Sequence, residues 1–278
     1  MVRVHRPLTL EDALRIRTRE HAQVLAGGTD WMVKRGRFSH DARPVVCIAQ
    51  LNELRQITRH ADELRVGAAC TLWQLLTSPL LPDYLKEPLA QMASPAIRNV
   101  ATIGGNLCNA SPAADALPML YALDAVVCLR SSAGEEAVPV RDFILAPGRT
   151  RLGEEQLVTQ ILIPLKSDWH CAYHKVAMRR ANSLSKLSFY ALADCQAGCP
   201  RDIRIAFGAV APTVVRCWEA EQEILLYLRL PATDHLQRII ARYDKLLQPI
   251  DDVRSSRAYR REVSLRLLAQ YLMERMSA

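Results

Sequence analysis

Two short segments in the N-terminal half combine a pair of glycines with hydroxyl, amide or carboxylate side chains. They read LAGGTD at 25–30 and TIGGN at 102–106. Glycine adopts positive φ and allows a backbone to approach a ligand closely, and successive exposed N–H groups form an anion-binding nest. Thr29, Thr102 and Asn106 would add side-chain donors. Two such segments that converge from different strands would hold a diphosphate from both sides.

Neither segment matches the dinucleotide fingerprint GxGxxG or the P-loop pattern GxxxxGK[ST], which argues against both standard phosphate sites. A single Gly-Gly pair after a strand is more typical of a plain turn. The two pairs together, with Asn109 and Asp115 downstream, favour a ligand site. For Asp115 two readings stay open: it accepts hydrogen bonds from ligand hydroxyls, or it caps a helix that runs to Leu123.

Metal-ligand patterns are missing from the sequence. No two of the cysteines form a CxxC pair, so a zinc ribbon or an iron–sulfur motif is not expected. The histidines have no ligand spacing either. We therefore predict no metal ligands in this chain, with the thiols free and mostly buried, and we name no catalytic residue. The eight cysteines are at 47, 70, 108, 128, 171, 195, 199 and 217.

The composition is that of a globular protein with a sizeable core. Half of the 278 residues are apolar, 23% are charged, and the net charge is +7. The basic residues are dispersed, whereas a nucleic-acid binder would cluster them on one face or tail. No apolar run approaches the ~18 residues of a membrane span, and the N-terminal residues lack a signal-peptide pattern. We expect a cytoplasmic protein that binds neither nucleic acid nor membrane.

The elements that would position these residues change in character near residue 165. Before it, short strands and helices alternate, which is typical of α/β or α+β folds. Thr9 with Asp12 and Thr71 with Gln74 predict capped helix starts. Strands are predicted in this half at 22–26, 44–51, 63–69, 125–130 and 156–165. After it, three antiparallel strands are predicted at 172–178, 188–195 and 202–211, and the chain is helical from Thr213 onward.

Beyond these patterns, long stretches resemble the FAD-binding subunits of the xanthine dehydrogenase and carbon monoxide dehydrogenase family of molybdenum hydroxylases. The resemblance runs over almost the whole chain, and the block IRNVATIGGN…ASPAAD is its most specific part. The similar segments are LAGGTDW at 25–31, SPAIRNVATIGGNLCNASPAADALPMLYALDA at 94–125, LGEEQLVTQILIP at 152–164, AYHKVAMRRANS at 172–183 and IRIAFGAVAPTVVRC at 203–217.

The resemblance implies an α+β fold with two domains. Residues 1–167 would form an FAD domain of the vanillyl-alcohol-oxidase type, with α/β lobes at about 1–53 and 54–167. Residues 168–278 would form a C-terminal domain with a three-stranded antiparallel sheet and a helical bundle. This layout agrees with the strand and helix patterns read independently above.

The resemblance also implies which residues contact FAD. Both diglycine segments would bind the pyrophosphate, Val158 would make an apolar contact, and Lys175 would lie near the isoalloxazine, where its charge stabilises the reduced flavin. Without the resemblance, Lys175 would be read as an exposed strand lysine. The implied FAD contacts are Gln23, Val24, Leu25, Ala26, Gly27, Gly28, Thr29, Asp30, Ala101, Thr102, Ile103, Gly104, Gly105, Asn106, Asn109, Asp115, Val158 and Lys175.

The function implied is electron transfer within a three-part complex. FAD, bound non-covalently, would take electrons from [2Fe–2S] clusters on one partner subunit and pass them to NAD or another acceptor. The molybdenum cofactor would lie on the other partner. The loop ANSLSK at 181–186 lacks the acidic residues of nicotinamide-using relatives, so the acceptor stays open.

Two alternatives to an electron-transfer subunit also stay open. One is a self-contained flavoprotein oxidase or reductase with its own small substrate. The other is a non-catalytic assembly factor, which the intact glycine segments disfavour. Oxidation of a substrate by the isolated chain would favour the first, and failure to retain flavin the second.

Overall fold

The computed structural model describes residues 2–37, 42–196, 199–229 and 233–276. The chain divides into two compact units. Unit 1 comprises Met1–Pro82, Ala93–Ser111 and Asp124–Leu165, and unit 2 comprises Asp83–Met92, Pro112–Leu123 and Lys166–Ala278. Two short segments of the N-terminal half therefore belong to the same unit as the C-terminal residues. The predicted domain boundary between 167 and 168 stays a prediction.

Unit 1 begins with a small parallel sheet in the order β1-β3-β2. Its strands are β1 (Val4–His5), β2 (Gln23–Leu25) and β3 (Val45–Cys47). Parallel neighbours need crossover connections, and the chain supplies α1 (Leu10–Glu20) after β1 and α2 (Thr29–Arg37) after β2. The predicted helix start at Thr9 is confirmed, because the Thr9 hydroxyl accepts from the Asp12 N–H at 3.1 Å.

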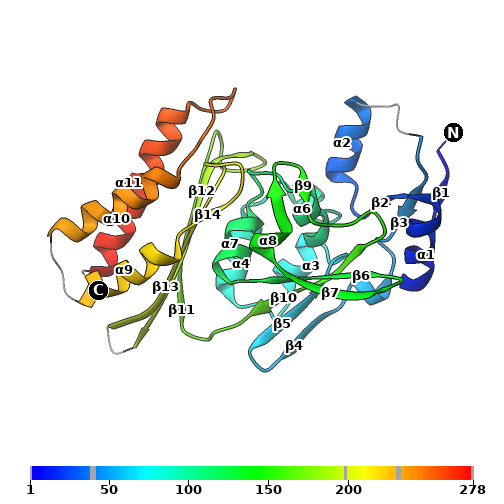
Figure 1. Cartoon of the computed structure of the whole chain (residues 1–278), viewed down its shortest axis with the longest axis horizontal. Coiled ribbons are helices and arrows are strands. Elements are labelled where there is room, and N and C mark those ends of the chain that lie inside the picture. Colours follow the sequence, from blue (N-terminus) through cyan, green and yellow to red (C-terminus); the bar gives the residue numbers. More distant parts are fainter. Residues whose placement is uncertain (1, 38–41, 197–198, 230–232, 277–278) are drawn as a thin grey trace. The chain divides into compact units, whose positions relative to one another are not determined.

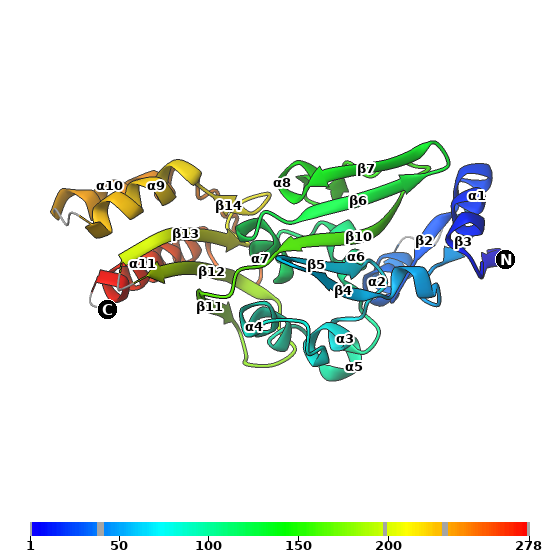
Figure 2. The same ribbon diagram turned by 90° about the horizontal axis from the view of Figure 1, so that it is seen from below.

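A five-stranded antiparallel sheet forms the rest of the unit 1 framework, and Figure 2 shows its strands side by side. In sheet order they are β4 (Ile57–His60), β5 (Glu63–Gly67), β10 (Leu157–Pro164), β6 (Val126–Ser131) and β7 (Gly134–Pro139). The three central strands were predicted. The two edge strands were not predicted, because these mostly exposed segments carry little apolar alternation.

Short elements complete unit 1. They are the 3₁₀ turn Asn52–Leu54, α3 (Leu72–Thr77), α5 (Pro95–Arg98), α6 (Ile103–Asn109), α8 (Val140–Phe143), β8 (Ile144–Ala146) and β9 (Arg149–Thr150). The predicted capping box of Thr71 and Gln74 is confirmed at the start of α3. The helix around Gly104 was not predicted from the sequence.

Unit 2 is built on an antiparallel sheet of four strands, one more than predicted. They are β11 (Trp169–Ala177), β12 (Ser185–Gln196), β13 (Cys199–Gly208) and β14 (Val215–Arg216), in that order. The fourth strand has two residues, too few for a periodic pattern. Helices α9 (Trp218–Arg229), α10 (Thr233–Leu246) and α11 (Arg257–Met276) cover one face (Figure 1).

Alternation along β12 determines which side chains meet these three helices. Leu187, Phe189 and Ala191 lie in the apolar core that the sheet shares with them, and the Phe189 and Phe207 ring centroids are 5.0 Å apart. Tyr190 points to the other face of the sheet, as alternation requires. Its hydroxyl donates to the Tyr84 carbonyl at 2.9 Å.

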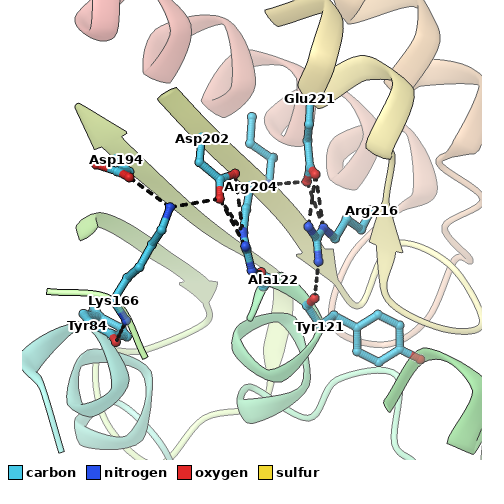
Figure 3. A network of polar contacts seen from close by, with 10 residues as sticks. Tyr84, Tyr121, Ala122, Lys166, Asp194, Asp202, Arg204, Arg216 and Glu221 are labelled. Carbon is cyan, nitrogen blue, oxygen red and sulfur yellow. Dashed lines mark hydrogen bonds and ion pairs between the residues drawn. The ribbon is translucent and has the colours of Figure 1, made fainter. Parts of the chain in front are cut away.

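Two short helices also belong to unit 2: α4 (Asp83–Ala90) and α7 (Ala116–Ala122). Every residue of α7 is buried. Its last carbonyls need donors, which two arginines provide (Figure 3): Arg216 Nη1 lies 2.5 Å from the Tyr121 oxygen, and Arg204 Nη1 lies 3.0 Å from the Ala122 oxygen. Cations at a helix C-terminus also oppose its dipole favourably, so α7 is fixed firmly at this end.

Sheets and helices together confirm the mixed α+β class. Across the part of the chain that the structure describes, no helix is both long and apolar enough to span a bilayer. Within the same residues, no three His, Cys, Asp or Glu side chains gather as a metal site would require.

Candidate functional site

Both diglycine segments line one cavity of about 250 Å³ in unit 1. That volume is below the ~300–1,000 Å³ typical of complete ligand pockets, so it suits part of a large ligand. The lining residues are Val24, Ala26, Gly27, Gly28, Thr29, Asp30, Trp31, Ile48, Ala68, Ala101, Thr102, Gly104, Gly105, Asn106, Cys108, Asn109, Leu152, Leu157 and Val158. Convergence of the two segments, which the sequence predicted, is therefore observed.

The first segment joins the end of β2 to the start of α2. Gly28 has φ +74°, which disfavours any residue with a Cβ. A Cβ built on Gly27 would lie 1.9 Å from the Val100 carbonyl oxygen, so only glycine allows this approach. Val100 precedes the second segment, and the close contact at Gly27 is what brings the two segments together.

The first segment has main-chain N–H groups that are available to bind a ligand. Among the residues that the structure describes, no acceptor engages the main-chain N–H groups of Gly27, Gly28, Thr29 or Asp30. They lie at the N-terminus of α2, where the helix dipole also favours negative charge. This end of the cavity is suited to a phosphate or another anion.

The second segment differs, because its N–H groups already have partners. Those of Ile103 and Gly104 donate to the carbonyls of Cys70 (3.1 Å) and Ala68 (3.0 Å). The Gly105 N–H donates to the Thr102 hydroxyl at 3.0 Å, and the Asn106 N–H to the Thr102 carbonyl at 2.9 Å. The predicted nest of amides at 102–106 is therefore wrong: these residues form the capped first turn of α6.

Close packing explains the glycines of this second segment. A Cβ on Gly104 would lie 2.6 Å from the Ala68 carbonyl oxygen, so glycine lets α6 approach the residues after β5. Gly105 is exposed to the cavity, and a Cβ there would meet only the Thr102 hydroxyl, at 2.8 Å. Gly104 is therefore needed for the packing of α6 against Ala68, whereas the missing side chain of Gly105 leaves space in the cavity.

Side chains of α6 supply polar groups that the backbone of this helix does not. The Asn106 side-chain oxygen is buried and has no hydrogen-bond partner among the described residues. Such an atom is costly unless a ligand or water satisfies it. Asn109 donates from Nδ2 to Asp30 Oδ2 at 3.1 Å, which links α6 to the start of α2.

Charge is scarce around the cavity. Asp30 is the single ionisable carboxylate in the lining, and neither lysine nor arginine is among the lining residues. An anionic group would therefore be held by main-chain N–H groups and the α2 dipole. Burial raises the pKa of the Cys108 thiol to about 12, and nearby Arg17 offsets this only partly. Cys108 is therefore a neutral residue of the cavity wall.

Most of the predicted site residues line the cavity, and five do not: Gln23, Leu25, Ile103, Asp115 and Lys175. Gln23 instead accepts from the Trp31 indole at 3.1 Å. Six lining residues were not among the predicted contacts: Trp31, Ile48, Ala68, Cys108, Leu152 and Leu157. Most of the six are apolar wall residues, which carry no chemical signal in a sequence.

Asp115 and Lys175 lie together in unit 2. Lys175 Nζ is 2.6 Å from Asp115 Oδ2, and the two side chains are only 5% and 8% exposed. Lys175 also donates to the Gln91 carbonyl at 2.9 Å. The reading of Lys175 as an exposed strand lysine is therefore excluded.

Asp115 precedes α7 without capping it. Its side chain makes no cap hydrogen bond to the helix. One oxygen pairs with Lys175, and the other accepts from the Ser185 hydroxyl at 2.5 Å. The capping alternative is wrong, and the carboxylate is instead the centre of a buried polar cluster.

The residues that line the cavity are chemically suited to part of FAD. Its unpartnered N–H groups suit a diphosphate, the orphaned Asn106 oxygen suits a donor on the ligand, and the Asp30 carboxylate suits hydroxyl groups. Apolar residues such as Ile48, Leu152 and Val158 suit a ring system.

Comparison with known protein families gives two matches that cover most of the chain. Residues 1–166 match the family described as the FAD binding domain in molybdopterin dehydrogenase. Residues 172–275 match the family described as the CO dehydrogenase flavoprotein C-terminal domain.

Individual relatives agree with the family matches. The xanthine dehydrogenase FAD-binding subunit of Escherichia coli O157:H7 is 36% identical over 225 residues, covering 78% of this chain and 77% of the relative. The glyceraldehyde dehydrogenase medium chain of Sulfolobus acidocaldarius is 30% identical over 263 residues, covering 92% and 91% of the two chains.

Solved structures share the fold. A chain of the carbon monoxide dehydrogenase from Hydrogenophaga pseudoflava superposes with a TM-score of 0.89 at 23% identity, over 97% of this chain and 95% of that one. A chain of quinoline 2-oxidoreductase from Pseudomonas putida 86 gives 0.89 at 22% identity, over 100% and 97%. At these identities the likeness establishes the fold alone.

Proposed function

This chain belongs to the family of FAD-binding subunits of molybdenum hydroxylases, as its sequence predicted, and we propose that it relays electrons within such a complex. Bound FAD would accept electrons from iron–sulfur clusters on one partner subunit and deliver them to NAD or another acceptor. A second partner would carry the molybdenum cofactor. The observation that carries this proposal is the single cavity shared by both diglycine segments.

The residues of this chain would divide the binding of FAD between them. The N–H groups of 27–30 would hold the diphosphate, and Asn106 would accept a hydrogen bond from the cofactor. Val158, which lies in the cavity wall, would make an apolar contact. The remaining predicted contacts, among them Asp115 and Lys175, are proposed on the family correspondence alone. No residue here is proposed to form a covalent bond to the flavin.

We also propose a domain type, domain boundaries and a cellular location for this chain. They are the vanillyl-alcohol-oxidase type of the FAD domain, its lobes at about 1–53 and 54–167, the 168–278 domain, and a cytoplasmic location. The acceptor is proposed as NAD or another molecule, because the loop at 181–186 has no carboxylate. Arg179, which precedes this loop, donates to the Asn182 carbonyl inside it at 2.8 Å.

The test has a binding arm and a complex arm. Apo protein titrated with FAD should bind one flavin per chain, measured by flavin fluorescence, and heat should release the flavin intact. Co-expression with the neighbouring subunits should give a complex with flavin and iron–sulfur absorbance. A chain that oxidises an organic substrate unaided and purifies without partners would contradict the electron-relay role and favour a self-contained flavoprotein.

A further inference from the structure

A buried serine on β12 holds the carboxylate that pairs with Lys175. Ser185 is 0% exposed, and its hydroxyl donates to Asp115 Oδ1 at 2.5 Å. Lys175 Nζ approaches the other oxygen, Oδ2, at 2.6 Å. Each oxygen of the carboxylate thus has its own donor, which fixes the rotation of the carboxylate plane. A change at either donor would be felt at the other.

The backbone of Ser185 is itself restrained. Arg254 Nη1 donates to the Ser185 carbonyl at 3.3 Å, and the Arg254 guanidinium pairs with Asp252 at 2.6 Å. Arg260, a fully buried arginine of α11, pairs with the second oxygen of Asp252 at 2.6 Å. Ser185 therefore lies at the end of a chain of charged hydrogen bonds that begins in the core of unit 2.

Asp115 is also restrained through the helix that follows it. The opposite end of α7 is held by the Arg204 and Arg216 contacts, and Glu221 in turn accepts from Arg216 Nε at 2.9 Å (Figure 3). Residues on a short, fully buried helix cannot shift independently of its ends. The α7 restraint fixes the backbone of Asp115, and the Ser185 hydroxyl fixes its side chain.

Lys175 retains a donor for a ligand. An ammonium group has three N–H donors. Within the described residues, Lys175 donates only to Asp115 and to the Gln91 carbonyl. These two contacts fix the direction of the third N–H, because the three donors are arranged tetrahedrally about Nζ.

We propose that Ser185 is a positioning residue: it orients the Asp115 carboxylate, and through it the Lys175 ammonium and its remaining N–H. The inference rests on the proposed function, in which Lys175 serves bound FAD. Without the hydroxyl, Oδ1 loses its donor and the carboxylate is no longer held at both oxygens, so the position of its pair with Lys175 is less well fixed. A purely structural serine would affect stability but not the reactivity of this one amine.

The primary test uses the apo chain and needs no flavin. Each lysine is acylated with trace acetic anhydride, and labelling is measured residue by residue by mass spectrometry, with Lys166 as internal reference. Ser185→Ala should raise Lys175 labelling about fivefold, which corresponds to losing one hydrogen bond of ordinary strength. Ser185→Thr keeps the hydroxyl and should label like the wild type.

Two further variants keep the test decisive. Ser264→Ala removes another fully buried hydroxyl, one that donates to the Arg260 carbonyl at 2.7 Å, and should leave Lys175 labelling unchanged. If Ser185→Ala does not fold, Ser185→Cys keeps the volume with a weaker donor and should raise labelling in the same direction. The proposal would be overturned if Lys175 were labelled equally in the wild type and in Ser185→Ala, or in Ser185→Cys where that variant replaces it.

The second readout uses FAD-loaded protein and separates this inference from the proposed function. With Lys175 displaced, the flavin midpoint potential should fall in Ser185→Ala and stay unchanged in Ser264→Ala, because positive charge near the flavin favours its reduced form. A wild-type chain that binds no FAD would overturn the proposed function, and the labelling result would then decide the role of Ser185 alone. An unchanged potential in Ser185→Ala would contradict the positioning role.

Discussion

The two diglycine segments are similar in sequence but differ in structure and in the hydrogen bonding of their N–H groups. In the first, Gly27 and Gly28 lead into α2 with the N–H groups of residues 27–30 unpartnered among the described residues. In the second, Gly104 and Gly105 lie inside α6, and the N–H groups of 103–106 are all bonded within the protein. Similar glycine patterns therefore leave N–H groups without a protein partner in one case and make a packing contact in the other.

The largest expected effect is at Gly27. In Gly27→Ala the new Cβ would lie 1.9 Å from the Val100 oxygen, a main-chain atom that cannot rotate away. The two segments must separate, so FAD affinity should fall about 100-fold or more, equivalent to about 2.7 kcal/mol. Flavin fluorescence titration measures the loss.

Gly105→Ala is the companion variant in the second segment, and it also adds a methyl group to the cavity lining. Its Cβ meets the Thr102 hydroxyl, a side-chain atom that can move, so the cost should be about 1 kcal/mol of stability from the weakened helix cap. Comparable FAD affinities in the two alanine variants would break the contrast between the segments.

Asn106→Leu should weaken FAD binding without lowering the stability of the apo protein. The Asn106 side-chain oxygen is buried without a partner, so Asn106→Leu should leave the apo free energy of unfolding unchanged or slightly higher. FAD affinity should fall about tenfold, because a hydrogen bond worth about 1.4 kcal/mol is lost. Calorimetry and flavin titration give the two quantities. Loss of apo stability with unchanged FAD affinity would show that this amide serves the fold.

Thr102 and Thr29, one in each segment, should differ in their effects on stability and on FAD binding. Thr102 caps α6, so Thr102→Ala should lower the free energy of unfolding by about 1 kcal/mol. Thr29 has no hydrogen bond to the described residues from its hydroxyl, so Thr29→Ala should change stability by less than about 0.5 kcal/mol and weaken FAD binding severalfold. Chemical denaturation of both apo variants checks this, and the reverse order of stabilities would contradict it.

The smallest expected effect is at Cys108, in the wall between the segments. Burial raises its pKa to about 12, so the thiol is protonated at pH 8. Iodoacetamide at pH 8 should leave Cys108 unmodified in the folded apo protein and modify it after denaturation. Rapid alkylation of the folded chain at Cys108, located by mass spectrometry, would contradict a neutral thiol in the cavity wall.

The sequence predicted the family, the central strands and the convergence of both segments, because these depend on local patterns and long motifs. It did not predict that residues 103–106 are helical, since that depends on Gly104 meeting Ala68, 36 positions away. The wall residues Ile48 and Leu152 look like any apolar residues. Ser185 reaches Asp115 across 70 positions, and no local pattern indicates such a contact.

Amide hydrogen exchange with and without FAD, resolved by NMR to single residues, tests the contrast between the segments most directly. The structure predicts that the amides of 27–30 exchange quickly in the apo chain and become protected when FAD binds. Those of 103–106 should already be protected in the apo chain and change little. Unchanged exchange at 27–30 in FAD-saturated protein would contradict the assignment of the diphosphate to α2.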